Sequence, residues 1–289
     1  TLPCLSGKAT AAIINGYTPV VHDRFLADGT PNPGFLLDET QLSGVALQRG
    51  VLITPKHFVT AAHIGATEAT FRGTDGVERT YQSASWQALT TFVPGVGNVS
   101  SDIALHTLTT EVDPSILPVP IVVGDLLGMV GQTLYAFDRQ ISAGRNVIDE
   151  IGIVEFTSGT GDSVAIRYSY DTDTNGGTGG LGADEIGLLV GDSGNAALML
   201  IDGQVGLIGT HMGIDVPAGS NASAGDLYSS FSTVVGAYED ELQAIVSSQG
   251  YSLRTINVTA IPEPTSFVCL AILLAGTWTR RRRLSLGRS

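Results

Sequence analysis

Cysteine is nearly absent from this chain of 289 residues, which contains only Cys4 and Cys269. Because no cysteine lies between them, a disulfide framework and a cysteine-based zinc site are excluded for the long middle of the chain. Charged residues are also scarce, at 15%, whereas hydrophobic residues make up 43%. This composition excludes disorder through excess charge, and the length suffices for one large domain or two sub-domains.

Positive charge is scarce too, and it is unevenly distributed. The sequence has 15 basic and 28 acidic residues, for a net charge of −13. A nucleic-acid-binding protein needs a cationic face for phosphates, so we expect no nucleic-acid partner. Residues 262–289 contain one acid and five arginines, which gives this tail +4 and leaves −17 for residues 1–261. The chain therefore combines a strongly acidic body with a short cationic tail.

The tail has three parts in order: Pro262-Glu263-Pro264, the uncharged run Phe267–Trp278, and Arg280–Arg283. Twelve residues are short for a helix that crosses a bilayer, and a buried helix is the alternative. Four arginines directly after the run instead favour a membrane stop signal. The order resembles the bacterial PEP-CTERM sorting signal. This resemblance implies export to the cell envelope or the extracellular space, a transmembrane-type helix that anchors the chain transiently, and processing by an exosortase-type enzyme.

Residues 1–12 end in the small residues Ala9-Thr10-Ala11-Ala12, as does the region before a signal-peptidase cut. We interpret them as a leader remnant or propeptide, and we expect a signal peptidase or a surface peptidase to cut after Ala12.

The middle of the chain is rich in signals for β-strands. Several short apolar runs are bounded by Gly, Pro or Asp, which predicts strands and a sandwich or barrel. These runs are Val51–Thr54, Val119–Val123, Ala196–Leu200 and Val205–Ile208. Apolar residues spaced by three and four positions predict one helix, from Ser230 to about Val246. We therefore expect an all-β body with a C-terminal helix and a hinge between two halves near residues 115–122.

Three short motifs contain the residue types of a nucleophilic hydrolase. They are Thr60-Ala61-Ala62-His63, Asp102-Ile103-Ala104-Leu105 and Gly191-Asp192-Ser193-Gly194. Each alone has an ordinary structural explanation, such as a buried histidine or a tight turn. Together, their order His, Asp, Ser resembles that of the chymotrypsin/trypsin-like serine proteases. The resemblance covers residues 13–247, and Tyr228–Val234 resembles the segment that opens the family's C-terminal helix. It implies two packed antiparallel β-barrels, with residues 248–261 as a linker to the tail.

The resemblance also implies a role for each motif residue. His63 is the general base, Asp102 orients its ring, and Ser193 is the nucleophile that forms an acyl-enzyme with a polypeptide substrate. A serine hydroxyl requires such a base because it is a poor nucleophile on its own. The backbone N–H groups of Gly191 and Ser193 are expected to form the oxyanion hole. Asp192 is expected to pair with a new N-terminal ammonium at Ile13, because Ile13-Ile14-Asn15-Gly16 resembles the family's mature N-terminus. The alternative is that Ile13 and Ile14 are ordinary strand residues.

Substrate preference is less well defined by the sequence. Gly187 stands where a trypsin has an acid, so we expect no preference for Arg or Lys at P1, the residue before the cleaved bond. Gly209-Thr210-His211 resembles the Gly-x-His of glutamyl endopeptidases, which implies an acidic P1 residue. An ordinary wall residue in a small or apolar pocket is the alternative reading of His211. Asn195 stands where the family usually has another glycine. We expect this departure to reshape the primed side of the cleft, which binds the residues after the cleaved bond.

Two further alternatives concern metal binding and activity. The segment from Asp171 through Asp173 and Asn175 to Gly176 opens like a calcium loop, but Gly182 replaces the glutamate at its twelfth position. A weak calcium site with Asp184 or Glu185 and a solvated turn both fit. We favour the turn, and we expect no cofactor. An inactive binding or matrix module on the same fold is the second function class, and an esterase or acyltransferase is the third.

Overall fold

The computed structural model describes residues 11–94, 96–155, 162–177 and 180–258. Both cysteines, most of the expected leader and the whole expected sorting signal at 262–289 lie outside these residues. Within the described part, no helix has both the length and the apolar composition that a membrane span requires.

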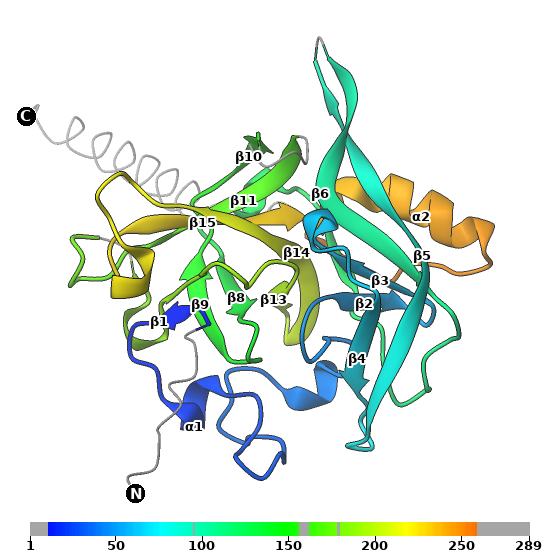
Figure 1. Cartoon of the computed structure of the whole chain (residues 1–289), viewed down its shortest axis with the longest axis horizontal. Coiled ribbons are helices and arrows are strands. Elements are labelled where there is room, and N and C mark those ends of the chain that lie inside the picture. Colours follow the sequence, from blue (N-terminus) through cyan, green and yellow to red (C-terminus); the bar gives the residue numbers. More distant parts are fainter. Residues whose placement is uncertain (1–10, 95, 156–161, 178–179, 259–289) are drawn as a thin grey trace, which may run out of the picture.

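The fold is mostly β, with two curled half-barrel sheets and a C-terminal helix (Figure 1). The five-stranded sheet has the order β2 (Val51–Thr54), β3 (His57–Thr60), β6 (Gly97–Leu108), β5 (Glu78–Val93) and β4 (Glu68–Arg72). The main path of the nine-stranded sheet is β10 (Glu150–Val154), β11 (Ser163–Tyr170), β15 (Tyr228–Val234), β14 (Gln204–Asp215), β13 (Ala196–Ile201), β8 (Thr133–Phe137) and β9 (Ala143–Val147). This architecture is compatible with the expected pair of barrels.

The remaining elements join these sheets or extend them. Parallel strands β7 (Ile121–Gly124) and β16 (Thr255–Val258) pair with each other, and β7 also pairs with β14. The short strands β1 (Ile13–Ile14) and β12 (Ile186–Gly187) form a separate antiparallel pair. The helices are α1 (Pro19–His22) and α2 (Glu239–Ser248), and the 3-10 turns are η1 (Glu39–Gln41), η2 (Ala62–Ile64), η3 (Leu127–Met129), η4 (Gly182–Asp184), η5 (Ala222–Ala224) and η6 (Val235–Tyr238).

The two sheets and the C-terminal helix share one hydrophobic core. A single buried cluster contains Val59 and Leu105 of the first sheet, Leu198 and Leu207 of the second, and Leu242 of α2. Burial of a large aliphatic side chain contributes about 1.5–3 kcal/mol, so this shared cluster strongly opposes separation of the sheets. The functional residues that lie where the sheets meet are therefore held on a rigid frame.

The expected start of the C-terminal helix was wrong. The helix begins at Glu239 and not at Ser230, because residues 228–234 form β15, whose side chains at first alternate between buried and half-buried positions. The apolar residues there satisfy a period of two as well as the helical spacing. In addition, residues 248–261, expected to be a linker, contain β16, which adds a strand to the second sheet.

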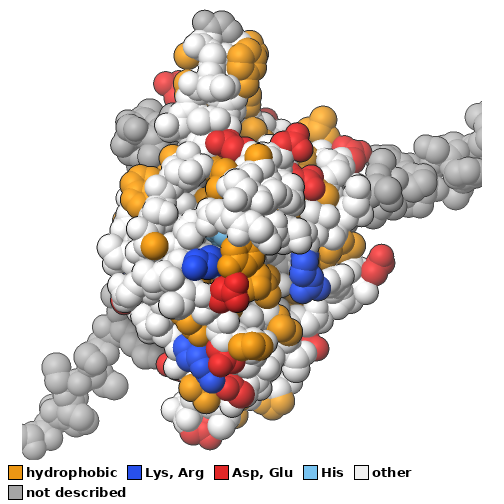
Figure 2. Space-filling model, turned by 90° about the vertical axis from the view of Figure 1, so that its right-hand side faces the viewer, with side chains coloured by type: hydrophobic (Ala, Val, Ile, Leu, Met, Phe, Trp, Pro, Cys, Tyr) orange, Lys and Arg blue, Asp and Glu red, His pale blue; other side chains and the backbone are white. Residues whose placement is uncertain are grey.

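Strands β5 and β6 form a long hairpin that projects from the body (Figure 1). Its end displays hydrophobic side chains to solvent (Figure 2), with Phe92 67% and Val96 72% exposed. At its base, Thr91 shares a hydrogen bond with the Tyr238 hydroxyl, and the Thr90 backbone N–H donates to Glu241 of α2. These contacts fix the part of β6 that contains Asp102.

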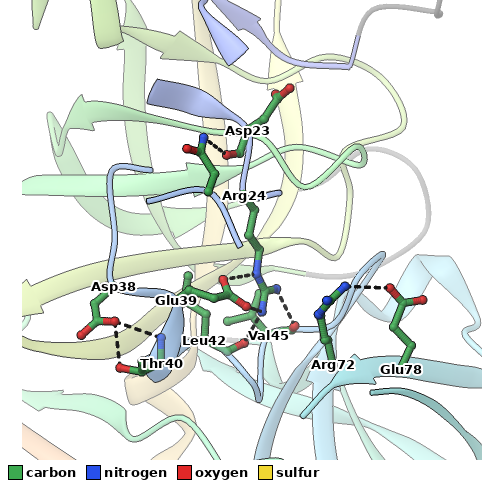
Figure 3. Close-up of polar contacts among 10 residues, drawn as sticks. Asp23, Arg24, Asp38, Glu39, Thr40, Leu42, Val45, Arg72 and Glu78 are labelled. Carbon is green, nitrogen blue, oxygen red and sulfur yellow. Dashed lines mark hydrogen bonds and ion pairs between the residues drawn. The ribbon is translucent and has the colours of Figure 1, made fainter. Parts of the chain in front are cut away.

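A buried arginine connects the N-terminal segment to the loop before β2 (Figure 3). Arg24 is fully buried, and its guanidinium donates to both carboxylate oxygens of Glu39 and to the carbonyls of Leu42 and Val45. The Leu42 and Val45 carbonyls need this donor because their hydrogen bonds are buried, and the Glu39 carboxylate is partly exposed. Arg24 therefore holds residues 39–45 in place below the first sheet.

Arg24→Ala is expected to lower the free energy of unfolding by about 3 kcal/mol, because it leaves a carboxylate and two carbonyls without a donor. Chemical denaturation followed by circular dichroism measures this loss. Arg167→Ala is the matched control, since its pair with Glu150 is exposed and should contribute less than about 1 kcal/mol. Equal losses in the two variants would contradict the role given to Arg24.

Candidate active site

The structure brings His63 and Asp102 together at the junction of the sheets. His63 lies in η2 directly after β3, and Asp102 lies in β6, the strand that pairs with β3. The His63 Nδ1 atom is 2.8 Å from Asp102 Oδ2, and the His63 backbone N–H donates to Asp102 Oδ1 at 3.0 Å. Because a buried carboxylate accepts from Nδ1–H, the imidazole keeps the tautomer in which Nε2 can accept a proton.

Side chains from the second sheet hold the backbone of Asp102. The Asp102 N–H donates to the Ser163 hydroxyl of β11 at 2.8 Å, and its carbonyl accepts from the Thr233 hydroxyl of β15 at 3.1 Å. Sequence reasoning assigned neither residue a role: Ser163 belongs to no recognisable motif, and Thr233 lies in Tyr228–Val234, a segment that was expected to open a helix. These two contacts hold Asp102, which belongs to the first sheet, against the second sheet. Ser193 lies in the loop between β12 and β13, and β13 belongs to that second sheet.

The loop that contains Ser193 is shaped by two glycines with left-handed backbone conformations. Gly191 has φ +106° and Gly194 has φ +82°, values that non-glycine residues rarely adopt. A Cβ at Gly194 would also lie 2.4 Å from the Thr60 hydroxyl. The Gly194 carbonyl accepts from Gly50 N–H at 2.9 Å, and its N–H donates to the His211 carbonyl at 2.8 Å. The loop is therefore clamped between the two sheets.

His63 and Ser193 line one cavity of about 290 Å³. The hydrogen bond between such a hydroxyl and such a ring is often long before a substrate binds, so the shared cavity is the observation that matters here. The backbone N–H groups of Gly191 and Ser193 donate to no acceptor among the described residues. A base, a hydroxyl and two unengaged N–H donors around one cavity are the groups that acyl transfer requires.

The rest of this cavity is mainly apolar. Its remaining lining is Leu188, Leu189, Val190, Gly191, Asp192, His211, Met212, Gly213 and Ile214. Sequence reasoning did not single out most of these residues, although they directly adjoin the Gly191–Gly194 and Gly209–His211 motifs. The sequence did offer a signal for a pocket, namely the apolar residues on either side of these two motifs. The cavity suits an uncharged side chain of a ligand.

Gly187 lies in β12 behind the cavity wall, beside a tyrosine. A Cβ at this position would lie 2.3 Å from the Tyr228 hydroxyl, which donates to the Leu188 carbonyl at 2.6 Å. Tyr228 thus fills the space that a larger residue at 187 would need. Position 187 therefore supplies no carboxylate to a basic side chain.

His211 lines the cavity, but its ring is engaged within the protein. Its Nε2–H donates to the Phe137 carbonyl, and Nδ1 accepts from the Ser232 hydroxyl, both at 2.9 Å. Complete burial lowers the pKa of His211 to about 3, so the ring is neutral at physiological pH. Gly209 and Thr210 precede it in β14, outside the cavity lining. These contacts favour the reading of His211 as a wall residue over recognition of an acidic ligand.

Asp192 is buried and points away from solvent. It accepts hydrogen bonds from the Leu189 N–H at 2.8 Å and the Arg139 N–H at 3.1 Å, and burial raises its pKa. Ile13 pairs with Gly187 in the β1–β12 ladder. The structure describes the uncut chain, in which Ile13 has no ammonium group, so the Asp192–Ile13 ion pair stays a prediction.

Two other expectations concern side chains near this loop. The described part of residues 171–185 contributes to no cluster of metal-ligating side chains. Asn175 instead accepts from the Thr172 N–H at 2.8 Å and donates to the Tyr170 carbonyl at 2.9 Å, as in a hydrogen-bonded turn. The side chain of Asn195 is almost completely buried, so it does not reshape the surface of the cleft.

Glu185, next to β12, is a buried carboxyl whose titration should destabilise the protein. Its Oε2 accepts from the Leu181 N–H, whereas Oε1 has no partner among the described residues. Burial raises the pKa of Glu185 to about 8. Between about pH 4.5 and pH 8 the folded state therefore binds a proton that the unfolded state releases, and the free energy of unfolding falls as pH rises.

Glu185→Gln is expected to remove this loss, because an amide stays neutral at every pH. Its Tm should exceed that of the unaltered protein by several degrees near pH 9, and the two should converge near pH 4.5. Scanning calorimetry at both pH values measures the difference. Glu150→Gln, at an exposed site, is the control and should follow the unaltered protein. Identical curves for Glu185→Gln and the unaltered protein would refute the role of Glu185.

No protein-family model matches the sequence, and no curated protein matches it either.

Proposed function

We propose that this protein is an exported serine endopeptidase of the chymotrypsin/trypsin-like type. The observation that carries the proposal is the His63–Asp102 hydrogen bond, beside a cavity that Ser193 shares with His63. The order of the three motifs along the chain and the two curled sheets support it. All three positions hold the residue types that acyl transfer needs, which favours an enzyme over an inactive binding module.

In the proposed reaction, His63 Nε2 takes the proton of the Ser193 hydroxyl as Oγ bonds to the carbonyl carbon of a peptide. The oxygen of that carbonyl becomes an oxyanion, which accepts hydrogen bonds from the N–H groups of Gly191 and Ser193. Collapse breaks the C–N bond, and His63 returns its proton to the leaving amine. Water then attacks the acyl-enzyme by the same path. An esterase would use the same steps, so activity on peptides is the distinguishing outcome.

For the P1 residue we propose a small or apolar side chain. The cavity walls are mostly apolar, Gly187 supplies no carboxylate, and His211 is neutral with both ring nitrogens engaged. An acidic P1 residue would lose its hydration there without gaining a cation, which costs several kcal/mol. The P1 residue is therefore expected to be neutral.

Activation and export complete the proposal. A cut after Ala12 would create an ammonium at Ile13, and an ion pair with this group would stabilise the ionised form of the buried Asp192. Asp192 lies between the two proposed oxyanion donors, so its ionisation bears directly on their placement. Export, anchoring through residues 262–289 and processing by an exosortase-type enzyme rest on the tail's resemblance to a sorting signal.

Cleavage-site profiling tests this proposal. Protein confirmed to begin at Ile13 is incubated with a diverse peptide library, and mass spectrometry identifies the new termini. We expect cleavage after small or apolar residues, and none in a control sample blocked beforehand with a serine-reactive phosphonate. Enrichment of Glu or Asp at P1 would overturn the proposed preference. Absence of any cleavage of peptides would favour the inactive module, or an esterase if small esters are still hydrolysed.

A further inference from the structure

Most arginines of the described body pair with carboxylates, but Arg49 does not. Five arginines form ion pairs within the described residues, namely Arg24, Arg72, Arg79, Arg145 and Arg167. Arg254, remote from the cavity in the fold, donates to the Pro118 carbonyl. Among the described residues, no carboxylate lies within ion-pair distance of Arg49. Its guanidinium is half-buried and donates to the Gly191 carbonyl at 3.2 Å. An arginine beside the proposed nucleophile thus keeps its charge available to a ligand.

Arg139 places a second guanidinium against the same glycine. A Cβ built on Gly191 would lie 2.7 Å from Arg139 Nη1, so this group passes directly over Gly191. The charges of Arg139 and Arg49 both lower the pKa of Asp192 and partly offset the effect of its burial. The two cations therefore lie close together around the Gly191–Ser193 segment, in a body that is otherwise strongly acidic.

These two arginines lie outside the apolar cavity. The cavity is lined by residues 188–193 and 211–214 with His63, whereas Arg49 Cβ lies 3.5 Å from a Cβ built on Gly194, the residue after Ser193. A peptide bond cleaved at Ser193 has its two halves running away from that residue in opposite directions. When the acyl half occupies the apolar cavity, the leaving half extends past Ser193 toward Gly194 and Arg49, and the Arg139 guanidinium against Gly191 lies at the edge of the cavity within reach of that half.

We propose that Arg49 and Arg139 form a cationic subsite that selects an acidic side chain on the leaving-group side of the cleaved bond. This inference rests on the proposed peptidase function. A guanidinium binds a carboxylate through two parallel hydrogen bonds, a geometry that a neutral amide does not match. The body's net negative charge repels acidic peptides at long range, so local cations are needed to accept one. The substrate class is a polypeptide with a neutral residue before the bond and Asp or Glu shortly after it.

Acyl transfer from a small ester tests this subsite separately from the P1 pocket. The ester acylates Ser193, and added dipeptide amides then compete with water for the acyl group. We compare Asp-Ala-amide with Asn-Ala-amide, and Ala-Asp-amide with Ala-Asn-amide. The acidic member of at least one pair should be the better acceptor by about five-fold at low salt, and added salt should reduce this ratio.

Variants assign the effect to the two arginines. The ratio should fall to about one in the Arg49→Gln/Arg139→Gln double variant and persist in Arg49→Lys, which keeps the charge. The exposed and distant Arg167→Gln is the matched control and should keep the ratio. Acylation is measured separately in each variant, so a general loss of activity is not mistaken for lost preference.

The two proposals fail in different ways. Equal transfer to acidic and neutral amides by an enzyme that acylates normally would overturn the subsite and leave the peptidase intact. A preference that survives in the double variant would overturn it as well. Absence of acylation would refute the proposed function, and the subsite with it.

Discussion

Asp102→Asn is expected to lower kcat about ten-thousand-fold while the protein stays folded. The asparagine Oδ1 can still accept from the His63 backbone N–H, as Asp102 Oδ1 does at 3.0 Å. The amide nitrogen then faces His63 Nδ1, so Nδ1 must accept and the ring proton moves to Nε2. A protonated Nε2 cannot take the proton of Ser193. Steady-state hydrolysis of a peptide identified by profiling measures the loss.

The control for this variant is a measurement of its fold by far-ultraviolet circular dichroism. Because an amide replaces a carboxylate of the same shape, the spectrum should be unchanged. A folded Asp102→Asn protein with a kcat within ten-fold of the unaltered enzyme would show that the His63–Asp102 contact is structural. It would remove the observation on which the proposed function rests.

Ser193→Ala is expected to have the largest effect, a loss of about a million-fold in kcat. The substitution removes only the hydroxyl, and neither Gly191 nor Gly194 loses its backbone hydrogen bonds. The acyl-enzyme pathway is then closed, and residual hydrolysis above the uncatalysed rate comes from substrate positioning and the oxyanion donors alone. Active-site titration before the kinetics excludes contamination by unaltered enzyme.

Ser193→Cys is a second variant at this position. A thiol can still form an acyl-enzyme, so a small residual burst is expected from Ser193→Cys and none from Ser193→Ala. Substantial peptidase activity in Ser193→Ala would mean that another residue is the nucleophile, and the assignment of the site would be wrong.

The contact between His63 and Asp102 was predictable because each residue belongs to a motif with a fixed place relative to a strand. The run Val51–Thr54, four apolar or β-branched residues, forms β2 with the predicted bounds. Its buried neighbour β3 then positions η2 and His63. Local composition was sufficient for β2, all of whose residues are buried. It did not reveal β3 (His57–Thr60), and the contact itself was expected from the resemblance of the motifs.

The C-terminal region was harder to predict because two periodicities overlap. Ser230 and Ser232 lie among apolar residues and are fully buried in β15. The Ser230 hydroxyl accepts from the Leu188 N–H, and Ser232 bonds to the His211 ring. These tertiary contacts outweigh the helical spacing, and no property of residues 230–238 by themselves reveals them. The hydrogen bonds of His211 could not be predicted from the sequence either, because its partners Phe137 and Ser232 are remote from it in the chain.

Covalent labelling by a fluorophosphonate probe tests the central claim most directly. The reagent reacts with a serine only when that serine is activated as a nucleophile. Protein that is folded and begins at Ile13 should take up one probe molecule per chain at neutral pH. Peptide mapping should place it on Ser193, and Asp102→Asn should label far more slowly. No adduct between about pH 6 and pH 9, or an adduct that persists in Ser193→Ala, would contradict the account.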